Sequence, residues 1–176
     1  MSYYNTEILN DKIQINYIDM NNKDINTKIY SLLKSKVENK CYKNGFILKD
    51  SIQPISKSLG KLVNLDSNNY LEYKIKYKVK IIKPTIGDII ECYINEKNKL
   101  GILAYIKYKD ITEKGKNNGI SDSPLLIIIP YESIDDIDKY NENNKIKIVV
   151  EATRVKFDAN KIQVIGNIIT KEQLMI

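Results

Sequence analysis

Strict alternation of apolar and charged residues between positions 68 and 82 constrains the fold of this chain most. The stretch NNYLEYKIKYKVKII has the two-residue period of a β-strand with one buried face. Its apolar positions are Tyr73, Ile75, Tyr77, Val79 and Ile81, and the residues between them are Lys74, Lys76, Lys78 and Lys80, called the lysine comb below. The apolar face must be covered by a core. For the comb two interpretations stay open: a phosphate track for RNA or DNA, and a solvated strand face that resists aggregation.

The sequence before this strand predicts a helix packed on a sheet. TEILNDKIQINYI alternates at Ile13, Ile15 and Tyr17, as in a strand. Asp24 is the expected N-cap of a helix whose apolar residues recur at helical spacing, namely Ile25, Ile29, Leu32, Leu33 and Val37. LGKLVNL predicts a short strand around residues 62–65. In CYKNGFIL, the Asn44-Gly45 pair predicts either a tight turn between two strands or a loop that ends in a glycine kink.

After the comb strand, the pattern and the charge both change around Lys83, Pro84 and Gly87, which mark the predicted domain boundary. Residues 1–83 carry a net charge of about +7, and residues 84–176 one of about −1. The second half predicts strands at 88–94, 101–108, 125–129, 145–155 and 161–168, with a polar loop at 109–124. We therefore predict an α+β chain: an N-terminal strand-helix-sheet domain, residues 1–83, and a five-stranded OB-type β-barrel, residues 84–176.

The composition excludes several kinds of chemistry. Because the chain has no His and only two Cys, far apart in sequence, it can form neither an ordinary zinc site nor a histidine general base. Cys41 and Cys92 are expected to be buried thiols. Asp135, Asp136 and Asp138 lack the glycine and the downstream glutamate of a calcium loop, which favours a solvated turn. We expect no catalytic residues, no bound metal and no cofactor.

The formal charge of +6 comes from 27 Lys and one Arg, Arg154, set against 22 acidic residues. Abundant Lys, Ile, Asn and Tyr are what A/T-rich codons specify, so the lysine count by itself says little about nucleic acid. Such a composition suits a protist or a large DNA virus. The longest apolar run is strand-sized, and the N-terminus has no basic segment followed by an apolar one, which predicts a soluble intracellular protein.

Several stretches occur in an order that resembles the stalk subunit of DNA-directed RNA polymerases, the family that contains the seventh subunit of eukaryotic RNA polymerase II and its archaeal counterpart. KSKVENKCYKNGFIL resembles the family's helix end and tip segment, and YKVKIIKPTIGDIIECYI resembles its Lys-Pro junction and the opening of its barrel. NKLGILAYI resembles its Asn-Lys-Leu-Gly turn and the next strand, and KIKIVVEATRVKFDANKIQVIGNI its closing strands. Together they cover nearly the whole chain. The resemblance implies an N-terminal tip domain and a C-terminal barrel of the ribosomal-protein S-one type.

The resemblance also implies a function without catalysis, as a subunit that docks on the core RNA polymerase near the clamp and offers nascent single-stranded RNA a weak surface. The implied docking residues are Val37, Glu38, Asn39, Lys40, Cys41, Lys43, Asn44, Gly45 and Phe46, and the junction residues are Lys83, Pro84 and Gly87. The RNA-binding candidates are Tyr93, Lys97, Lys99, Tyr105, Lys107, Tyr108 and Arg154. The family usually includes a second stalk subunit, and the sequence leaves open whether this member pairs with one.

This sequence departs from the family at two places. Asn39 stands where the family has a glycine after Val-Glu, which bears on the shape of the tip loop. Leu100, Leu103 and Ile129 stand where many such barrels stack RNA bases on aromatic or histidine side chains. Strong RNA binding by the barrel alone is therefore not expected.

Alternatives remain for each candidate. The tip segment could be an ordinary surface loop. An exposed pair of Tyr93 and Tyr105 could stack RNA bases, or pack against a partner subunit or under the 109–124 loop. Arg154 could contact RNA or form an ion pair with Glu151 or Asp158.

Two other functions compete with the stalk interpretation. One is a free-standing OB-fold RNA-binding accessory protein of translation or RNA decay, and the other is a magnesium-dependent nucleic-acid hydrolase. The stalk interpretation places the chain with the transcription machinery, in the nucleus if it is cellular and in host cytoplasm or virions if it is viral. Neither a membrane nor a small-molecule substrate is expected.

Overall fold

The computed structural model describes residues 3–16, 24–43, 45–65, 68–107, 111, 119–134 and 136–169, and the chain forms two compact units. The first, called the helix unit, comprises Asn5–Asn39 and Ile47–Ile81. The second, called the barrel unit, comprises Met1–Tyr4, Lys40–Phe46 and Ile82–Ile176. The hairpin segment Lys40–Phe46 thus groups with the barrel, although it lies within the first 83 residues.

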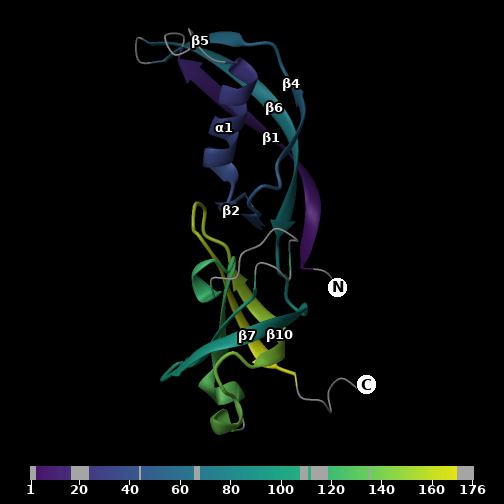
Figure 1. Cartoon of the computed structure of the whole chain (residues 1–176), viewed down its shortest axis with the longest axis vertical. Coiled ribbons are helices and arrows are strands. Elements are labelled where there is room, and N and C mark those ends of the chain that lie inside the picture. The colour runs from purple at the N-terminus through teal and green to yellow at the C-terminus, as the bar shows by residue number, and fades with distance from the viewer. Residues whose placement is uncertain are drawn as a thin grey trace. The chain divides into compact units, whose positions relative to one another are not determined.

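In the helix unit, the long strand β6 (Asn68–Ile82) is the centre of the sheet. It pairs with β1 (Tyr4–Asn16) and, antiparallel, with β4 (Gln53–Lys57) and β5 (Lys61–Leu65). The alternation predicted for β6 is confirmed: its apolar positions from Tyr73 to Ile81 are buried and the lysine comb is exposed. Figure 1 shows α1 lying alongside β1 and β6.

The helix α1 (Ile25–Val37) begins and ends as the sequence predicts. The Asp24 carboxylate caps it, accepting a hydrogen bond from the Asn26 N–H at 3.1 Å. Ile29, Leu33 and Val37 are buried. On its exposed side, Lys36 Nζ lies 3.2 Å from Asp11 Oδ1 on β1. Three of the five residues of the predicted apolar stripe therefore pack in the core, and the other two, Ile25 and Leu32, are half-buried.

The sequence analysis assigned no strand to Gln53–Lys57, which the structure shows as β4. The strand contains Pro54, and proline cannot donate to a ladder of hydrogen bonds. The strand forms nonetheless because its residues are exposed at the sheet edge, and the register shifts between Pro54 and Ser56. An edge strand with an irregularity at the proline tolerates the missing donor.

The barrel unit contains a closed five-stranded barrel in the order β7-β8-β9-β11-β10, with β10 returning to β7. The strands are β7 (Ile89–Asn98), β8 (Gly101–Tyr105), β9 (Leu125–Pro130), β10 (Lys145–Arg154) and β11 (Ile162–Ile168). Only β9 and β11 pair in parallel. This arrangement is consistent with the predicted OB-type barrel. Compared with the prediction, β7 extends further, to Asn98, and β8 ends earlier, at Tyr105.

Alternate residues of the barrel strands fill its interior. The fully buried members are Ile90, Cys92, Ile94, Ile102, Ala104, Leu125, Ile127, Ile129, Ile148, Ile162 and Val164. The predicted burial of both thiols is confirmed, since Cys41 and Cys92 are free and fully buried. Short 3-10 turns, η3 (Gly119–Ser121), η4 (Tyr131–Ser133) and η5 (Ile137–Lys139), connect the strands. Among the described residues, no helix is long and apolar enough to cross a membrane.

The glycine in the Asn-Lys-Leu-Gly turn is required by its surroundings. Gly101 has a φ of 130°, and a Cβ there would lie 2.0 Å from the carbonyl oxygen of Ile129 on β9. On the other side of the turn, Asn98 Oδ1 accepts a hydrogen bond from the Leu100 N–H at 2.9 Å. Asn98 and Gly101 therefore fix the β7–β8 hairpin from both ends.

Candidate functional site

The predicted docking segment begins where α1 ends. The Glu38 N–H donates to the Lys34 carbonyl oxygen at 2.9 Å and caps the helix, and the next residue, Asn39, has a φ of 58°. This left-handed conformation after a helix is the one that glycine favours and asparagine tolerates. Asn39 therefore makes, without a glycine, a backbone turn of the kind that glycine favours.

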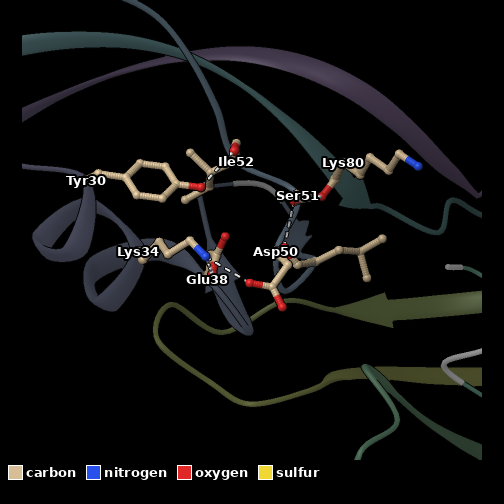
Figure 2. Close-up of polar contacts among 8 residues, drawn as sticks. Tyr30, Lys34, Glu38, Asp50, Ser51, Ile52 and Lys80 are labelled. Atoms are coloured by element: carbon tan, nitrogen blue, oxygen red, sulfur yellow. Dashed lines mark hydrogen bonds and ion pairs between the residues drawn. The ribbon is translucent and has the colours of Figure 1, made fainter. Parts of the chain in front are cut away.

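Glu38 is a carboxylate held almost out of solvent. Its side chain is 9% exposed, and Oε1 is buried without a hydrogen-bond partner in the described part of the chain. Burial raises the pKa of its carboxyl, while Lys34 and the backbone N–H groups of Asp50 and Ile52 act in the opposite direction. In Figure 2, Lys34 and Asp50 point toward each other beside Glu38. Lys34 Nζ lies 2.8 Å from Asp50 Oδ1 but 3.9 Å from Glu38 Oε2, so its ion pair with Asp50 is the stronger of the two.

Hydrogen bonds from the neighbouring loop hold this cluster in place. The Tyr30 hydroxyl donates to the Ile52 carbonyl oxygen at 3.2 Å, and Ser51 Oγ donates to the Leu48 carbonyl oxygen at 2.6 Å (Figure 2). The loop that follows the docking segment is thus tied to α1 through side chain to backbone contacts.

The docking segment itself is a β-hairpin, which resolves the alternatives left by the sequence in favour of strands. β2 (Lys40–Tyr42) and β3 (Gly45–Ile47) pair, and the Asn39 N–H donates to the Ile47 carbonyl oxygen at 2.9 Å. Asn44 lies outside the described residues.

The strand β2 binds the loop between β10 and β11. The Cys41 N–H donates to the Ala159 carbonyl oxygen at 2.7 Å, and the Asp158 N–H donates to the Cys41 carbonyl oxygen at 2.8 Å. Lys40 Nζ lies 2.6 Å from Asp158 Oδ1, and the rings of Tyr42 and Phe157 are 5.7 Å apart. Two backbone hydrogen bonds, an ion pair and a ring contact thus join the hairpin to the last loop of the barrel.

Burial divides the docking residues into two groups. Val37, Cys41 and Phe46 are at most 1% exposed, so their side chains belong to the core and offer nothing to a partner in this conformation. Gly45 is buried as well, whereas Asn39 and Lys43 are exposed. Lys43, with a φ of 56°, holds its ammonium 5.5 Å from the centre of the Tyr42 ring. The accessible part of the hairpin is therefore polar and cationic.

The junction residues form a short capped turn. The Lys83 N–H donates to the Tyr3 carbonyl oxygen at 2.9 Å, and Pro84 is buried. The Asp88 carboxylate accepts hydrogen bonds from the N–H and the hydroxyl of Thr85 at 2.8 and 2.9 Å. Gly87, with a φ of 87°, donates its N–H to the Val150 carbonyl oxygen at 2.8 Å, which fixes the start of the barrel against β10.

Tyr93, Tyr105 and Lys107 come together on the barrel, but not as an exposed tyrosine pair. Tyr93 and Tyr105 are paired across β7 and β8 with ring centres 6.0 Å apart. The expectation that both are exposed is wrong, because Tyr105 is only 5% exposed. Lys107 Nζ lies 3.6 Å from the centre of the half-buried Tyr93 ring. A base could stack on that ring face only after displacing the ammonium.

After β8, the chain returns to contact this strand again at η3 and Ser123. η3 contacts β8, and the buried Ser123 accepts a hydrogen bond from the Ile106 N–H at 3.2 Å. Tyr108 lies outside the described residues.

The remaining barrel candidates are spread along the strands. Lys97 and Lys99 are exposed at the far end of the β7–β8 hairpin, next to Leu100, which is 73% exposed. Ile129 is fully buried, so it has no surface to offer a base. Lys145, at the first position of β10, is paired with Tyr93, and Arg154 is at the last position of that strand. The two ends of a strand of this length are about 30 Å apart. Arg154 and Tyr93 therefore belong to separate surfaces.

Arg154 lines a hollow of about 340 Å³ on the outside of the barrel. It is paired across the strands with Gln163, which is paired with Leu126, so these three side chains share one face. Lys156 and Lys161 add two further cations to the lining. Neither acid considered for an ion pair reaches Arg154: Asp158 pairs with Lys40, and Glu151 accepts from Asn167. In the described part of the chain Arg154 has no ion pair, which leaves it open to an anion.

Sequence reasoning missed Phe157, Asp158 and Ala159 as partners of the hairpin. The stretch between β10 and β11 contains no glycine or proline to mark a special turn, although Asp158 has a φ of 61°. Asp136 and Asp138 form a local turn, in which Asp136 Oδ1 accepts from the Asp138 N–H at 3.1 Å, and Asp135 lies outside the described residues.

Comparison with known proteins identifies a relative over most of the chain. The chain is 30% identical over 141 residues to the DNA-directed RNA polymerase II subunit rpb7 of Dictyostelium discoideum, an alignment that covers 77% of this chain and 78% of the relative. No model of a known protein family matches. An alignment that covers 77% of this chain is longer than the barrel unit, so the similarity is not limited to a shared barrel. The chain therefore belongs to the rpb7 family of DNA-directed RNA polymerase subunits.

Proposed function

We propose that this chain is a non-catalytic stalk subunit of a multisubunit DNA-directed RNA polymerase. The observation that carries the proposal is the similarity to a polymerase II subunit across 77% of the chain. A closed barrel preceded by a helix-and-sheet unit is consistent with the domain order expected for such a subunit. Such a subunit would act by binding other subunits and RNA, without catalysing a reaction itself.

The docking surface we propose is the exposed part of the β2–β3 hairpin, and the proposed domain boundary stays near Lys83 and Pro84. Because Val37, Cys41 and Phe46 are buried, a partner would meet Asn39, Lys43 and main-chain groups. A core subunit with a complementary acidic rim fits such a surface. Binding that is tighter when the clamp is closed would shift the polymerase toward that state.

The barrel is proposed to give nascent single-stranded RNA a weak, sequence-independent surface. The half-buried Tyr93 with Lys107 above its ring is one contact point, and the hollow lined by Arg154 and Lys156 is another. With no aromatic side chain at Leu100, Leu103 or Ile129, little stacking energy is available. Contacts to phosphate would therefore dominate over contacts to bases.

Affinity purification of the tagged chain from its native source, followed by mass spectrometry, tests the proposal. The large polymerase subunits should be recovered in near-equal amounts, and a second stalk subunit, if this member has one, should be recovered with them. A Lys43→Glu variant should lose the polymerase, while Lys156→Glu, the same charge change on the barrel, should retain it. Recovery of the wild-type chain alone, or with ribosomes or RNA-decay factors, would contradict the proposal and favour a free-standing RNA-binding protein.

The proposed location follows from the same association. A cellular polymerase would place the chain in the nucleus, and a polymerase encoded by a large DNA virus would place it in host cytoplasm or in virions. Recovery of the polymerase subunits identifies which enzyme the chain serves.

A further inference from the structure

The lysine comb on β6 is a regular row of cations that the proposed docking and barrel surfaces do not use. Lys74, Lys76, Lys78 and Lys80 are all exposed, while Ile75, Tyr77 and Val79 between them are buried, as is Tyr73 before them. In the described part of the chain, none of the four ammonium groups forms an ion pair. Elsewhere in the same unit lysines do find carboxylates: Lys12 pairs with Glu72 at 3.1 Å and Lys34 with Asp50 at 2.8 Å.

The strand next to the comb, β4, adds hydrogen-bonding groups on the same face, while its one charged residue, Lys57, is paired with the buried Ile75 and donates a hydrogen bond to Asn26 Oδ1. Gln53 on β4 is paired with Lys78, and Ser56 is paired with Lys76, so each shares a face with its lysine. All residues of β4 are exposed. At one end of the comb, the nearest acid on β6 is Glu72, which is already held by Lys12 and by the Gln14 amide at 3.1 Å. The face therefore presents net positive charge together with an amide and a hydroxyl.

The spacing of the comb favours a particular kind of anion. Residues two apart on a β-strand are separated by about 6.7 Å, so the four ammonium groups repeat along a nearly linear row about 20 Å long. This repeat is of the same order as the separation of successive phosphates in an extended nucleic-acid strand. In a duplex each strand curves away around the helix, so a linear row would meet fewer successive phosphates. The comb itself offers no base-stacking platform, since the rings of Tyr73, just before it, and of Tyr77, within it, face the core.

We propose that the lysine comb binds the phosphate backbone of single-stranded nucleic acid, RNA or DNA, in an extended conformation and without sequence preference. Each lysine contacts one phosphate, and Gln53 and Ser56 hydrogen-bond to the same backbone. The site lies within the helix unit and does not depend on attachment to a polymerase or on the barrel candidates.

The test measures the salt dependence of binding of the full chain to a fluorescent oligo-uridine of about 12 nucleotides, whose bases stack weakly. Four phosphate contacts predict that affinity falls about 50-fold between about 50 and 200 mM salt. In K76Q/K78Q two contacts are lost, and the fall should be only about 7-fold over the same range. Oligo-deoxyuridine should behave like the RNA. A duplex of equal length should make fewer phosphate contacts, so its affinity should depend less steeply on salt.

A matched control is available on β10, where Lys145 and Lys147 are also two residues apart but both pair with Glu91, at 2.6 and 3.5 Å. The K145Q/K147Q variant removes the same charge at the same spacing and should keep the wild-type salt dependence. If it changes the dependence as much as K76Q/K78Q does, the comb is not a specific site and the proposal is overturned.

Other outcomes identify other occupants. If K97Q/K99Q changed the salt dependence of binding and K76Q/K78Q did not, the proposal for the comb would be overturned, and the barrel would be the RNA-binding surface. Displacement of the RNA by an equal length of poly-glutamate as readily as by unlabelled RNA would assign the comb to an acidic protein instead. If the chain bound no single strand at low salt, the proposal for the comb would be overturned. The proposed role as a polymerase subunit is tested separately, by affinity purification.

Discussion

The ammonium of Lys40, in the docking hairpin, lies 2.6 Å from the carboxylate of Asp158 in the β10–β11 loop. Asp158 also donates its backbone N–H to the Cys41 carbonyl oxygen, and it holds a left-handed φ of 61°. Three features of one residue, its charge, its N–H and its backbone conformation, thus fix the loop to the hairpin.

Substitutions at Asp158 should separate the charge from the backbone conformation. Asparagine tolerates the left-handed region, so Asp158→Asn loses only the ion pair with Lys40. Because the Asp158 side chain is 61% exposed, we expect the free energy of unfolding to fall by less than about 1 kcal/mol. Asp158→Ala loses the pair and adds a strained conformation, and should cost about 1–2 kcal/mol more. Urea unfolding measures both. Equal losses for the two variants would show that the left-handed conformation contributes nothing.

The buried Glu38 carboxyl should make stability depend on pH. Burial raises the pKa of Glu38 in the folded chain above its value in the unfolded chain. Above the folded pKa, ionised Glu38 therefore lowers the free energy of unfolding. This loss disappears as the pH falls through the folded pKa toward the unfolded pKa. Glu38→Gln removes the ionisation, so its stability advantage over wild type should be greatest near neutral pH and shrink on acidification. Urea unfolding of both proteins across the acidic range measures this. An advantage that grows as the pH falls would show that the carboxylate is stabilised by its surroundings.

The β7–β8 turn should not accept any side chain at Gly101. A Cβ there would lie 2.0 Å from the Ile129 carbonyl oxygen, so Gly101→Ala must displace backbone of β9 as well as strain its own φ. We expect a loss of at least about 3 kcal/mol, or failure to fold. Gly87 also has a positive φ, but nothing lies within 4 Å of its Cβ position, so Gly87→Ala should cost only about 1–2 kcal/mol. Thermal unfolding compares the two, and equal losses would mean that the close approach is relieved without cost.

Lys107 should have a double effect on RNA binding by the barrel. Its ammonium covers one face of Tyr93, which blocks stacking, but it also supplies a charge for phosphate. In Lys107→Gln, binding of uridine oligomers should weaken and become less salt-dependent, while the preference for purine oligomers, which stack better, should rise. Tyr93→Leu in the same background should abolish that preference. A preference unaffected by Tyr93→Leu would place base contacts elsewhere.

Both thiols should be unreactive in the native chain. Burial raises the pKa of Cys41 to about 11 and that of Cys92 to about 12, so little thiolate forms at neutral pH. A thiol reagent should therefore modify neither cysteine natively and both in denaturant. Because Cys41 lies in the hairpin and Cys92 in the barrel core, mass spectrometry of slow native labelling would also tell which of the two regions opens first. Rapid native labelling of Cys92 would contradict the closed barrel.

Local patterns in the sequence were enough to predict most of the fold. The alternation around Tyr77 and the helical spacing of Ile29 and Leu33 are signals carried by neighbouring residues, and the structure has a strand and a helix there. No strand was predicted at β4, where Pro54 is atypical of a strand interior and is tolerated because β4 is exposed at the sheet edge.

The candidate site was harder to predict because its geometry depends on residues distant in the chain. Tyr105 lies at a position of β8 that the alternation predicts to face outward, yet it is buried, which no residue beside it in the sequence indicates. Nothing near Cys41 in the sequence indicates that its backbone pairs with Ala159. Contacts of this kind are set by the closure of the barrel and not by a motif, so sequence identified the right segments and could not assign which side chains stay accessible.

The pairing of Cys41 with Ala159 also bears on how the chain is made. The ribosome synthesises β2 early and the β10–β11 loop near the end. The main-chain groups of Cys41 that bind Asp158 and Ala159 therefore lack these partners until most of the polypeptide has emerged. The hairpin proposed to dock on the polymerase would then be completed last, together with the final barrel strand. A chain interrupted during translation would present an unfinished hairpin, so assembly would admit only subunits that have been synthesised through β11.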